Sequence, residues 1–136
     1  MKWQRKWQNE AENNFFKQGD IVYCDLGQGA SSEQSGIRPC IILQNDVGNR
    51  YSPTTLIAPI SSKVKLNKNG RLQPTHFIIE NYQEVGLKSR SMILFEQIRT
   101  ISKERILDRK PIGHLDIDKI KNHILVAFGL QTTTTK

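Results

Sequence analysis

The sequence has no long apolar run and is poor in cysteine and aromatic residues. The chain of 136 residues contains 2 cysteines, and aromatic residues make up 7% of it. No apolar run approaches the roughly 18 residues that a membrane-spanning helix needs, and the N-terminus lacks the apolar segment of a secretory signal. These absences predict a cytoplasmic protein in which Cys24 and Cys40, each flanked by apolar residues, are buried free thiols.

The signatures of metal and cofactor chemistry are also missing. The 3 histidines are His76, His114 and His123, and none forms a zinc-like spacing with a second histidine or a cysteine. The sequence contains no phosphate-binding P-loop, no dinucleotide fingerprint and no nucleophile elbow. We therefore expect no metal and no cofactor, which leaves either a cofactor-free reaction or a protein without catalysis.

Positive charge is what the chain has in excess. It carries 20 Lys and Arg against 13 Asp and Glu, a formal net charge of +7. This balance suits a polyanionic partner such as a nucleic acid, although an acidic protein partner would fit as well. The length predicts a single domain that is large enough to bury a core.

Short β-branched and aromatic segments separated by polar loops dominate the chain. The predicted strands are residues 20–26, 39–44, 54–61, 75–79, 91–98 and 99–102. Pro59 predicts an edge or a bulge in its strand. Residues 27–36 and 45–53 are predicted polar loops, and the basic segment 63–71 carries an Asn-Gly turn signal at residues 69–70.

One convincing helix follows, at residues 116–130. Asp116 can cap it, Gly129 can end it, and its apolar stripe is formed by Ile117, Ile120, Ile124, Ala127 and Phe128. Together these elements predict a mainly β fold, a small and strongly bent barrel or half-barrel that the helix closes on one face. Residues 1–14 are predicted to be an N-terminal arm and residues 131–136 a C-terminal tail.

Four motifs in order resemble the MazF/PemK family of bacterial toxin ribonucleases. They are KQGDIVYCDL, SEQSGIRPCIILQNDVGNRYSPTTLIAPISS, PTHF and SMILFEQIRTISKERI, and the resemblance extends from about residue 17 to residue 130. It implies a compact SH3-like barrel of the MazF/PemK/CcdB type over residues 15–130, with a C-terminal helix, that forms a homodimer. It also implies a MazE-like antitoxin that covers the RNA groove with an acidic segment.

The implied activity is sequence-specific, metal-independent cleavage of single-stranded RNA. The products would carry a 2′,3′-cyclic phosphate or 3′-phosphate and a 5′-hydroxyl. The family's key arginine falls on Arg38, and its key hydroxyl falls on Ser61, where relatives usually have threonine. A guanidinium binds two phosphate oxygens and stays ionised, and Pro39 biases Arg38 toward an extended backbone. The general base is open: His76 is a candidate, but stacking on a base or hydrogen bonding to it, without proton transfer, is the favoured role of this residue.

Polar residues around the loops are candidates for reading RNA bases, which are recognised by stacking and by hydrogen bonds to their edges. The candidates are Ser32, Glu33, Gln34, Asn45, Arg50, His76, Ser91, Glu96 and Gln97. Each could instead be a solvated loop or strand-end residue, and Arg50 could form a structural ion pair. Two other functions stay open: a noncatalytic nucleic-acid-binding barrel, and a poison of a protein target such as a topoisomerase.

Overall fold

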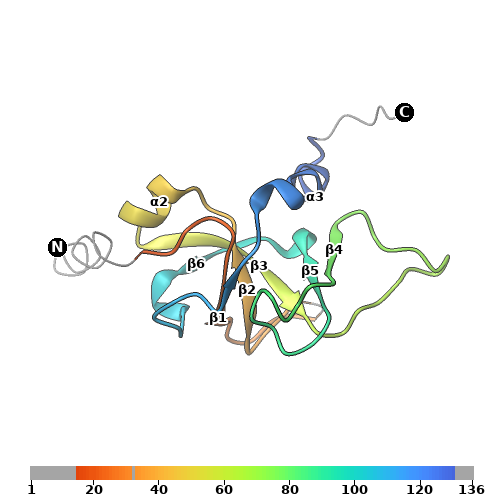
Figure 1. Cartoon of the computed structure of the whole chain (residues 1–136), viewed down its shortest axis with the longest axis horizontal. Helices are drawn as coiled ribbons and strands as arrows, with labels where there is room; N and C mark the ends of the chain where they lie inside the picture. Colours follow the sequence, from red (N-terminus) through yellow and green to blue (C-terminus); the bar gives the residue numbers. More distant parts are fainter. Residues whose placement is uncertain (1–14, 32, 131–136) are drawn as a thin grey trace.

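The computed structural model describes residues 15–31 and 33–130, and its architecture is mainly β (Figure 1). The strands are β1 (Asp20–Asp25), β2 (Ile37–Ile42), β3 (Thr54–Ser61), β4 (His76–Ile79), β5 (Ser91–Leu94), β6 (Arg99–Ser102) and β7 (Gly113–His114). The helices are α2 (Asp46–Tyr51) and α3 (Lys121–Ala127), with 3-10 turns η1 (Phe95–Gln97), η2 (Lys103–Arg105) and η3 (Ile117–Lys119). The predicted arm and tail lie outside the described residues, as does Ser32.

Strand β3 is the centre of the sheet. The strand order is β4-β5-β3-β2-β1-β7, and β6 pairs with β3. All pairings are antiparallel. On one side β3 pairs with β2; on the other, residues up to Ile57 pair with β6 and residues from Ile60 pair with β5. Because β3 changes partner midway, the sheet curls into a half-barrel, which confirms the predicted fold class.

Pro59 lies at this change of partner. The ladder with β6 ends at Ile57 and the ladder with β5 begins at Ile60, so the missing N–H of Pro59 leaves both ladders intact. Proline is therefore tolerated inside a central strand; of the two predicted possibilities, an edge or a bulge, the edge is wrong.

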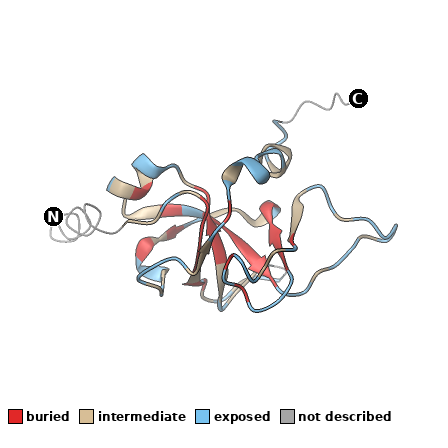
Figure 2. Cartoon of the chain, in the orientation of Figure 1, coloured by how far each residue is buried: buried red, intermediate tan, exposed pale blue. Residues whose placement is uncertain are grey.

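The two faces of the sheet bury separate apolar clusters, and the alternation of side chains along each strand divides them. The first cluster includes Ile21, Ile41, Ala58, Ile60 and Ile93. The second cluster includes Val22, Cys24, Cys40, Ile42 and Ile57. Figure 2 shows buried residues running along the middle strands, as expected for a sheet covered on both faces.

The C-terminal helical segment covers the first cluster. Ile117, Ile120, Ile124 and Ala127 pack against it, which confirms most of the predicted stripe. Phe128 is 60% exposed, so its assignment to the stripe is wrong. The predicted single helix is also wrong, because the chain forms η3 and then α3, with Ile120 at φ −119° between them.

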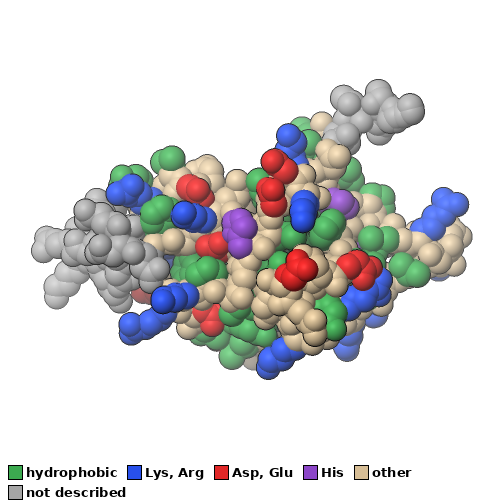
Figure 3. Space-filling view, in the orientation of Figure 1, with side chains coloured by type: hydrophobic (Ala, Val, Ile, Leu, Met, Phe, Trp, Pro, Cys, Tyr) green, Lys and Arg blue, Asp and Glu red, His purple; other side chains and the backbone are tan. Residues whose placement is uncertain are grey.

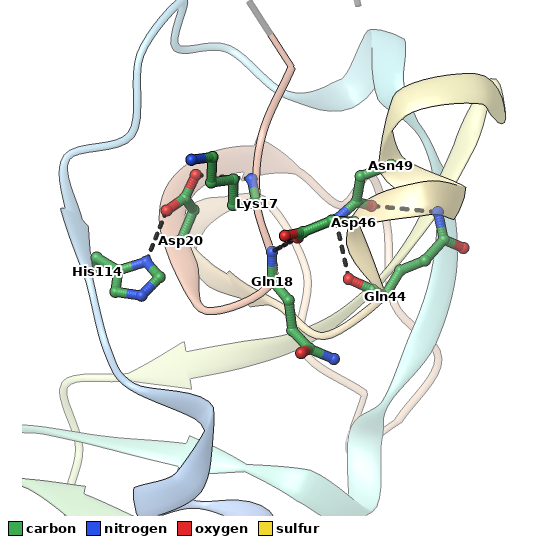
Figure 4. A network of polar contacts seen from close by, with 7 residues as sticks. All are labelled: Lys17, Gln18, Asp20, Gln44, Asp46, Asn49 and His114. Carbon is green, nitrogen blue, oxygen red and sulfur yellow. Dashed lines mark hydrogen bonds and ion pairs between the residues drawn. The ribbon is translucent and has the colours of Figure 1, made fainter.

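The predicted polar loop at residues 45–53 contains the short helix α2, so that prediction is wrong. Asn45 caps the helix, because its Oδ1 accepts a hydrogen bond from Gly48 N at 2.8 Å. Asn49 is buried and its amide joins Gln44 and Thr55, whose hydroxyl donates to Asn49 Oδ1 at 2.7 Å. Figure 4 shows the contacts between Gln44 and Asn49 beside the start of β1. Polar side chains, rather than apolar burial, hold α2 on the sheet.

The same view shows hydrogen bonds that hold the chain in place at the start of β1 (Figure 4). Asp20 accepts hydrogen bonds from Lys17 N and from the His114 ring, both at 2.8 Å. Gln18 N donates to Asp46 Oδ1 at 2.8 Å. These contacts join β1 to β7 and to α2, and they fix the strand that supports the site described below.

Two further sequence predictions need correction. The predicted strand 91–98 ends at Leu94, and Phe95 turns into η1 with its ring in the first cluster. The two-residue strand β7, which pairs with β1, was not predicted. Within the described ranges, no helix has both the length and the apolar character required to span a membrane.

His123 of α3 packs against the aromatic rings of the first cluster and its neighbours. Its ring lies 5.2 Å from the Phe77 ring and 5.9 Å from the Phe95 ring, measured between centroids. Burial lowers the pKa of His123 below its ordinary value of 6.5. As the pH falls, the unfolded chain takes up this proton before the folded chain does. The stabilising contribution is therefore complete above pH 6.5 and is lost as the pH falls through the folded-state pKa.

We expect His123→Gln to weaken the acid sensitivity of folding, because glutamine does not titrate. The free energy of unfolding is measured by urea titration of both proteins at about pH 7.5 and about pH 5. The loss between these values should be smaller in the variant than in the unmodified chain. An equal or larger loss in the variant would contradict this assignment.

Candidate functional site

Arg38 lies near the start of β2 and Ser61 at the end of β3, two strands that pair with each other. The ladder between β2 and β3 pairs Cys40 with Pro59, and continuing that register by two residues sets Arg38 opposite Ser61. Arg38 alternates with Cys40, and Ser61 alternates with Ile57; Cys40 and Ile57 belong to the second cluster. Because alternate residues share a face, both side chains lie on the face of the sheet that carries this cluster. The register therefore directs the two residues that the motifs singled out to the same region of the sheet, two positions beyond the paired residues Cys40 and Pro59.

The guanidinium of Arg38 is held but not neutralised. Its Nε donates to the carbonyl oxygen of Ser35 at 2.9 Å. Among the described residues, no carboxylate forms an ion pair with it. The terminal nitrogens of a guanidinium suit two oxygens of a phosphate or carboxylate. Arg38 is therefore a half-buried positive charge that is oriented by the backbone and suited to an anionic ligand.

Ser61 is more enclosed, with only 7% of its surface exposed. Its Oγ accepts a hydrogen bond from Lys63 N at 3.1 Å. A hydroxyl has one donor hydrogen as well as its acceptor lone pairs, so this contact fixes the oxygen and still leaves a donor. Ser61 pairs with Met92 of β5, which places the hydroxyl near the end of β3.

A hollow of about 350 Å³ lies where β2 begins, β3 ends and β5 begins. Its lining combines two basic side chains, three serines and an apolar floor: Tyr23, Ile37, Arg38, Pro39, Ile60, Ser62, Leu87, Lys88, Ser89 and Ser91. Ser61 is not among these lining residues, whereas Arg38, on the neighbouring strand β2, is. Ser91 was a candidate from the sequence. Ser62 ends one of the family motifs but was not singled out, and Lys88 and Ser89 lie outside the motifs.

The predicted base-reading loop, residues 27–36, folds back toward η1. Gln34 N donates to Gln97 Oε1 at 2.8 Å, while Glu33 Oε1 accepts from Ala30 N at 2.9 Å. The structure thus brings Gln34 of the loop next to Gln97 of η1, and the same loop contacts Arg38 through Ser35. Ser32, another candidate in this loop, lies outside the described residues.

His76 and Glu96 form a pair, with 3.0 Å between His76 Nε2 and Glu96 Oε2. The β4–β5 ladder pairs His76 with Leu94 and Ile78 with Met92, the partner of Ser61. His76 therefore shares a face with Ser61, two strands away across the sheet and about 7 Å further along it. It forms no hydrogen bond with Arg38 or Ser61 within the described ranges.

Asn45 and Arg50 lie at the other end of β2 from Arg38. Asn45 caps α2. Arg50 lies over two aromatic rings, 5.8 Å from the Phe15 centroid and 5.4 Å from the Tyr51 centroid. The structure gives both residues local contacts and does not bring them to the Arg38–Ser61 pair.

A basic segment leaves β3 directly after Ser61. Residues 62–75 connect β3 to β4 and include Lys63, Lys65, Lys68 and Arg71. Gly70 N donates to Asn67 O at 2.9 Å, which confirms the predicted turn. Figure 3 shows lysine and arginine side chains at the end of the molecule where this segment extends. No group of three or more His, Cys, Asp or Glu residues that could hold a metal occurs in the part of the chain that the structure describes.

Comparison with known proteins now defines the family. The sequence model for the PemK-like, MazF-like toxins of type II toxin–antitoxin systems matches residues 17–124. The chain belongs to this family. Endoribonuclease EndoA of Bacillus subtilis (strain 168) is 40% identical over 117 residues, covering 84% of this chain and 95% of the relative. Endoribonuclease MazF of Staphylococcus saprophyticus is 38% identical over 117 residues, covering 85% and 93%. The family resemblance is thus confirmed, and the chain is a toxin endoribonuclease of the MazF and EndoA type.

Solved structures of MazF toxins share the fold. MazF of Deinococcus radiodurans superposes with a TM-score of 0.66 at 16% identity, covering 86% of this chain and 99% of that one. A mycobacterial endoribonuclease, solved in complex with its cognate antitoxin, gives a TM-score of 0.62 at 20% identity, covering 86% and 96%. The curled sheet with a C-terminal helix is therefore the MazF fold.

Two cysteines lie beneath the site. Cys24 pairs with Arg38 across the β1–β2 ladder, and Cys40 Sγ donates to Arg38 O at 3.6 Å. Both thiols are free and fully buried, as predicted. The neighbouring thiol of Cys24, together with burial, raises the pKa of Cys40 far above its ordinary value. A neutral thiol is a poor nucleophile, so these cysteines are part of the packing under Arg38.

We expect both thiols to resist alkylation in the folded chain. Iodoacetamide at about pH 8 should modify neither cysteine of the native protein and both in urea, as measured by mass spectrometry. Gln83→Cys, which adds a thiol at an exposed position, serves as the reactive reference. Alkylation of Cys24 or Cys40 in the folded protein, at the rate measured for the thiol introduced at position 83, would contradict this expectation. It would show that the packing beneath Arg38 is open to solvent.

Proposed function

We propose that this toxin cleaves single-stranded RNA without a metal ion, at one phosphate held between Arg38 and Ser61. The observation that supports the proposal is the register of β2 against β3, whose continuation by two residues sets these two side chains opposite each other on one face. Arg38 supplies an unneutralised charge there, and Ser61 supplies a fixed hydroxyl. The proposed domain is residues 15–130, and the family match covers most of it.

RNA carries its own nucleophile, so the protein has to position and stabilise rather than attack. The 2′-oxygen forms a bond to phosphorus, the bond from phosphorus to the 5′-oxygen breaks, and a 2′,3′-cyclic phosphate and a 5′-hydroxyl result. The 2′-hydroxyl loses its proton to a base, and the leaving 5′-oxygen takes up another. The terminal nitrogens of Arg38 donate to the phosphoryl oxygens, where negative charge develops in the transition state. Ser61 donates its hydroxyl hydrogen to the same phosphate.

Residues around this pair read the bases. Glu33 and Gln34 approach from the loop, and Glu96 approaches from η1; Gln97, the remaining candidate in η1, accepts a hydrogen bond from Gln34 N. His76, which Glu96 holds, offers a ring on the same face for stacking or hydrogen bonding. Exposed base edges of a single strand are recognised through such contacts. The lysines and arginine of residues 62–75 attract the phosphate backbone nonspecifically.

The proposed protein partner is a MazE-like antitoxin with an acidic segment. The chain carries a net charge of +7, and Arg38 forms no ion pair with a described carboxylate. A mycobacterial endoribonuclease of this fold was solved with its cognate antitoxin, and MazF of Deinococcus radiodurans was solved with MazE. Carboxylates of such a segment would occupy the positions that phosphates take in RNA, and would thereby block cleavage.

A homodimer is also proposed. Large apolar side chains stay exposed on the single chain, including Val47 at 71%, Tyr51 at 61% and Phe128 at 60%. A second copy would remove some of this apolar surface from water, which favours association.

Cleavage of a long single-stranded RNA in EDTA tests the function. We expect discrete cuts with 5′-hydroxyl ends, mapped by primer extension. Arg38→Ala should slow cleavage by roughly 100-fold or more, because the charge that stabilises the transition state is lost. Ser61→Ala should also slow it, whereas Ser61→Thr keeps the hydroxyl and should stay active. Arg90→Ala is the matched control, since Arg90 is exposed and pairs with Glu80.

The outcomes separate the competing functions. RNA that is bound but uncut by the unmodified chain would contradict the proposal and favour a noncatalytic binding barrel. RNA that is neither bound nor cut would favour a protein target. Equal losses in Arg38→Ala and Arg90→Ala would show that Arg38 contributes only general positive charge.

A further inference from the structure

Two hydrogen bonds connect Gln97 to the guanidinium of Arg38 through the backbone of the loop. Gln97 Oε1 accepts from Gln34 N at 2.8 Å, and these residues are 63 positions apart in the sequence. The next residue, Ser35, accepts from Arg38 Nε through its carbonyl oxygen at 2.9 Å. The side chain of Gln97 thus holds the peptide segment that in turn holds the arginine.

The base of the loop is closed independently of Gln97. Leu26 N donates to Gly36 O at 2.9 Å, and Gly36 N donates to Gly27 O at 2.7 Å. Gly27 and Gly36 have φ values of +71° and +74°, which glycine adopts without strain. Among the hydrogen bonds of residues 27–31 and 33–36, the one to Gln97 is the contact that reaches outside the β1–β2 hairpin. It therefore fixes where the segment beside Arg38 lies relative to the rest of the sheet.

We infer that Gln97 is a positioning residue for Arg38, and that it acts through the acceptor oxygen of its side chain. The inference rests on the proposed function, in which Arg38 binds the reacting phosphate. With Nε bound to Ser35 O, the plane of the guanidinium is set and its terminal nitrogens are presented to the ligand. A shift of the loop would rotate this plane, and small misplacements of a group at the reacting atoms slow a reaction steeply.

This role differs from reading a base, and the chemistry of the amide separates the two. The oxygen of Gln97 accepts from Gln34 N, whereas the NH₂ of the same amide carries only donors. Gln97→Glu keeps an acceptor oxygen and removes the donors. Gln97→Met keeps the approximate length of the side chain and removes the acceptor and the donors. A positioning role predicts that the two variants differ; a base-reading role predicts that both change the selected sequence.

The test is single-turnover cleavage of short RNAs that carry the mapped cut sequence or its single-base variants. We expect Gln97→Met to lower the rate at saturating RNA by roughly tenfold or more, equally for all cut sequences, with RNA affinity little changed. Gln97→Glu should slow cleavage of the preferred sequence less than Gln97→Met does, because it keeps an acceptor oxygen for Gln34 N. Gln83→Met makes the same chemical change at an exposed glutamine and should have no effect.

A second measurement is independent of activity. Hydrogen exchange at the backbone amide of Gln34 should be faster in Gln97→Met than in Gln97→Glu, while thermal unfolding confirms that both variants are folded. Full activity of Gln97→Met, equal loss in both variants, or a change of cut sequence without a loss of rate would overturn the inference. If the unmodified chain does not cut RNA, the proposed function fails. If the unmodified chain cuts RNA and Arg38→Ala does not, the proposed function holds. Full activity of Gln97→Met would then contradict only the positioning role of Gln97.

Discussion

The antiparallel pairing of β2 with β3 is the constraint on which the site depends. A shift of this register by one residue would turn every side chain of one strand to the other face. The two apolar clusters prevent that shift, because Ile42 and Ile57 lie in one cluster and Ile41 and Ala58 lie in the other. The same core packing that stabilises the sheet therefore keeps Arg38 opposite Ser61. The positions of the site residues thus depend on the apolar side chains that β2 and β3 bury on both faces of the sheet.

The site combines a rigid floor with polar contacts that set orientation. The buried thiols of Cys24 and Cys40 lie under Arg38, and Pro39 restricts its backbone. The direction of the guanidinium comes from a different source, the carbonyl of Ser35 in the loop, whose neighbour is bound to η1. The arginine stays charged without a carboxylate partner among the described residues. Such a group is costly to desolvate unless an anion arrives, and this favours the binding of RNA or of an acidic antitoxin segment.

Much of the fold could be predicted from the sequence because strand signals are local. Residues 54–61 and 99–102 were predicted as the strands that β3 and β6 form. Short turns were harder: Phe95–Gln97 continues the apolar pattern of β5 and yet forms η1, because the ring of Phe95 enters the core. Arg38 and Ser61 came from the family motifs, while the contact between Gln34 and Gln97 could not be predicted, since no local pattern joins positions so far apart. The placement of Asn45 and Arg50 away from Arg38 likewise depends on the direction in which β2 runs.

The most direct test of the account is a crystal structure of this toxin with an RNA whose cut nucleotide lacks the 2′-hydroxyl, so that binding occurs without cleavage. The account predicts that one phosphate lies within hydrogen-bond distance, about 3 Å, of the terminal nitrogens of Arg38 and of Ser61 Oγ together. Gln34 N should stay bonded to Gln97. A scissile phosphate seated instead in the hollow at Ser62 and Ser91, out of reach of Ser61, would contradict it.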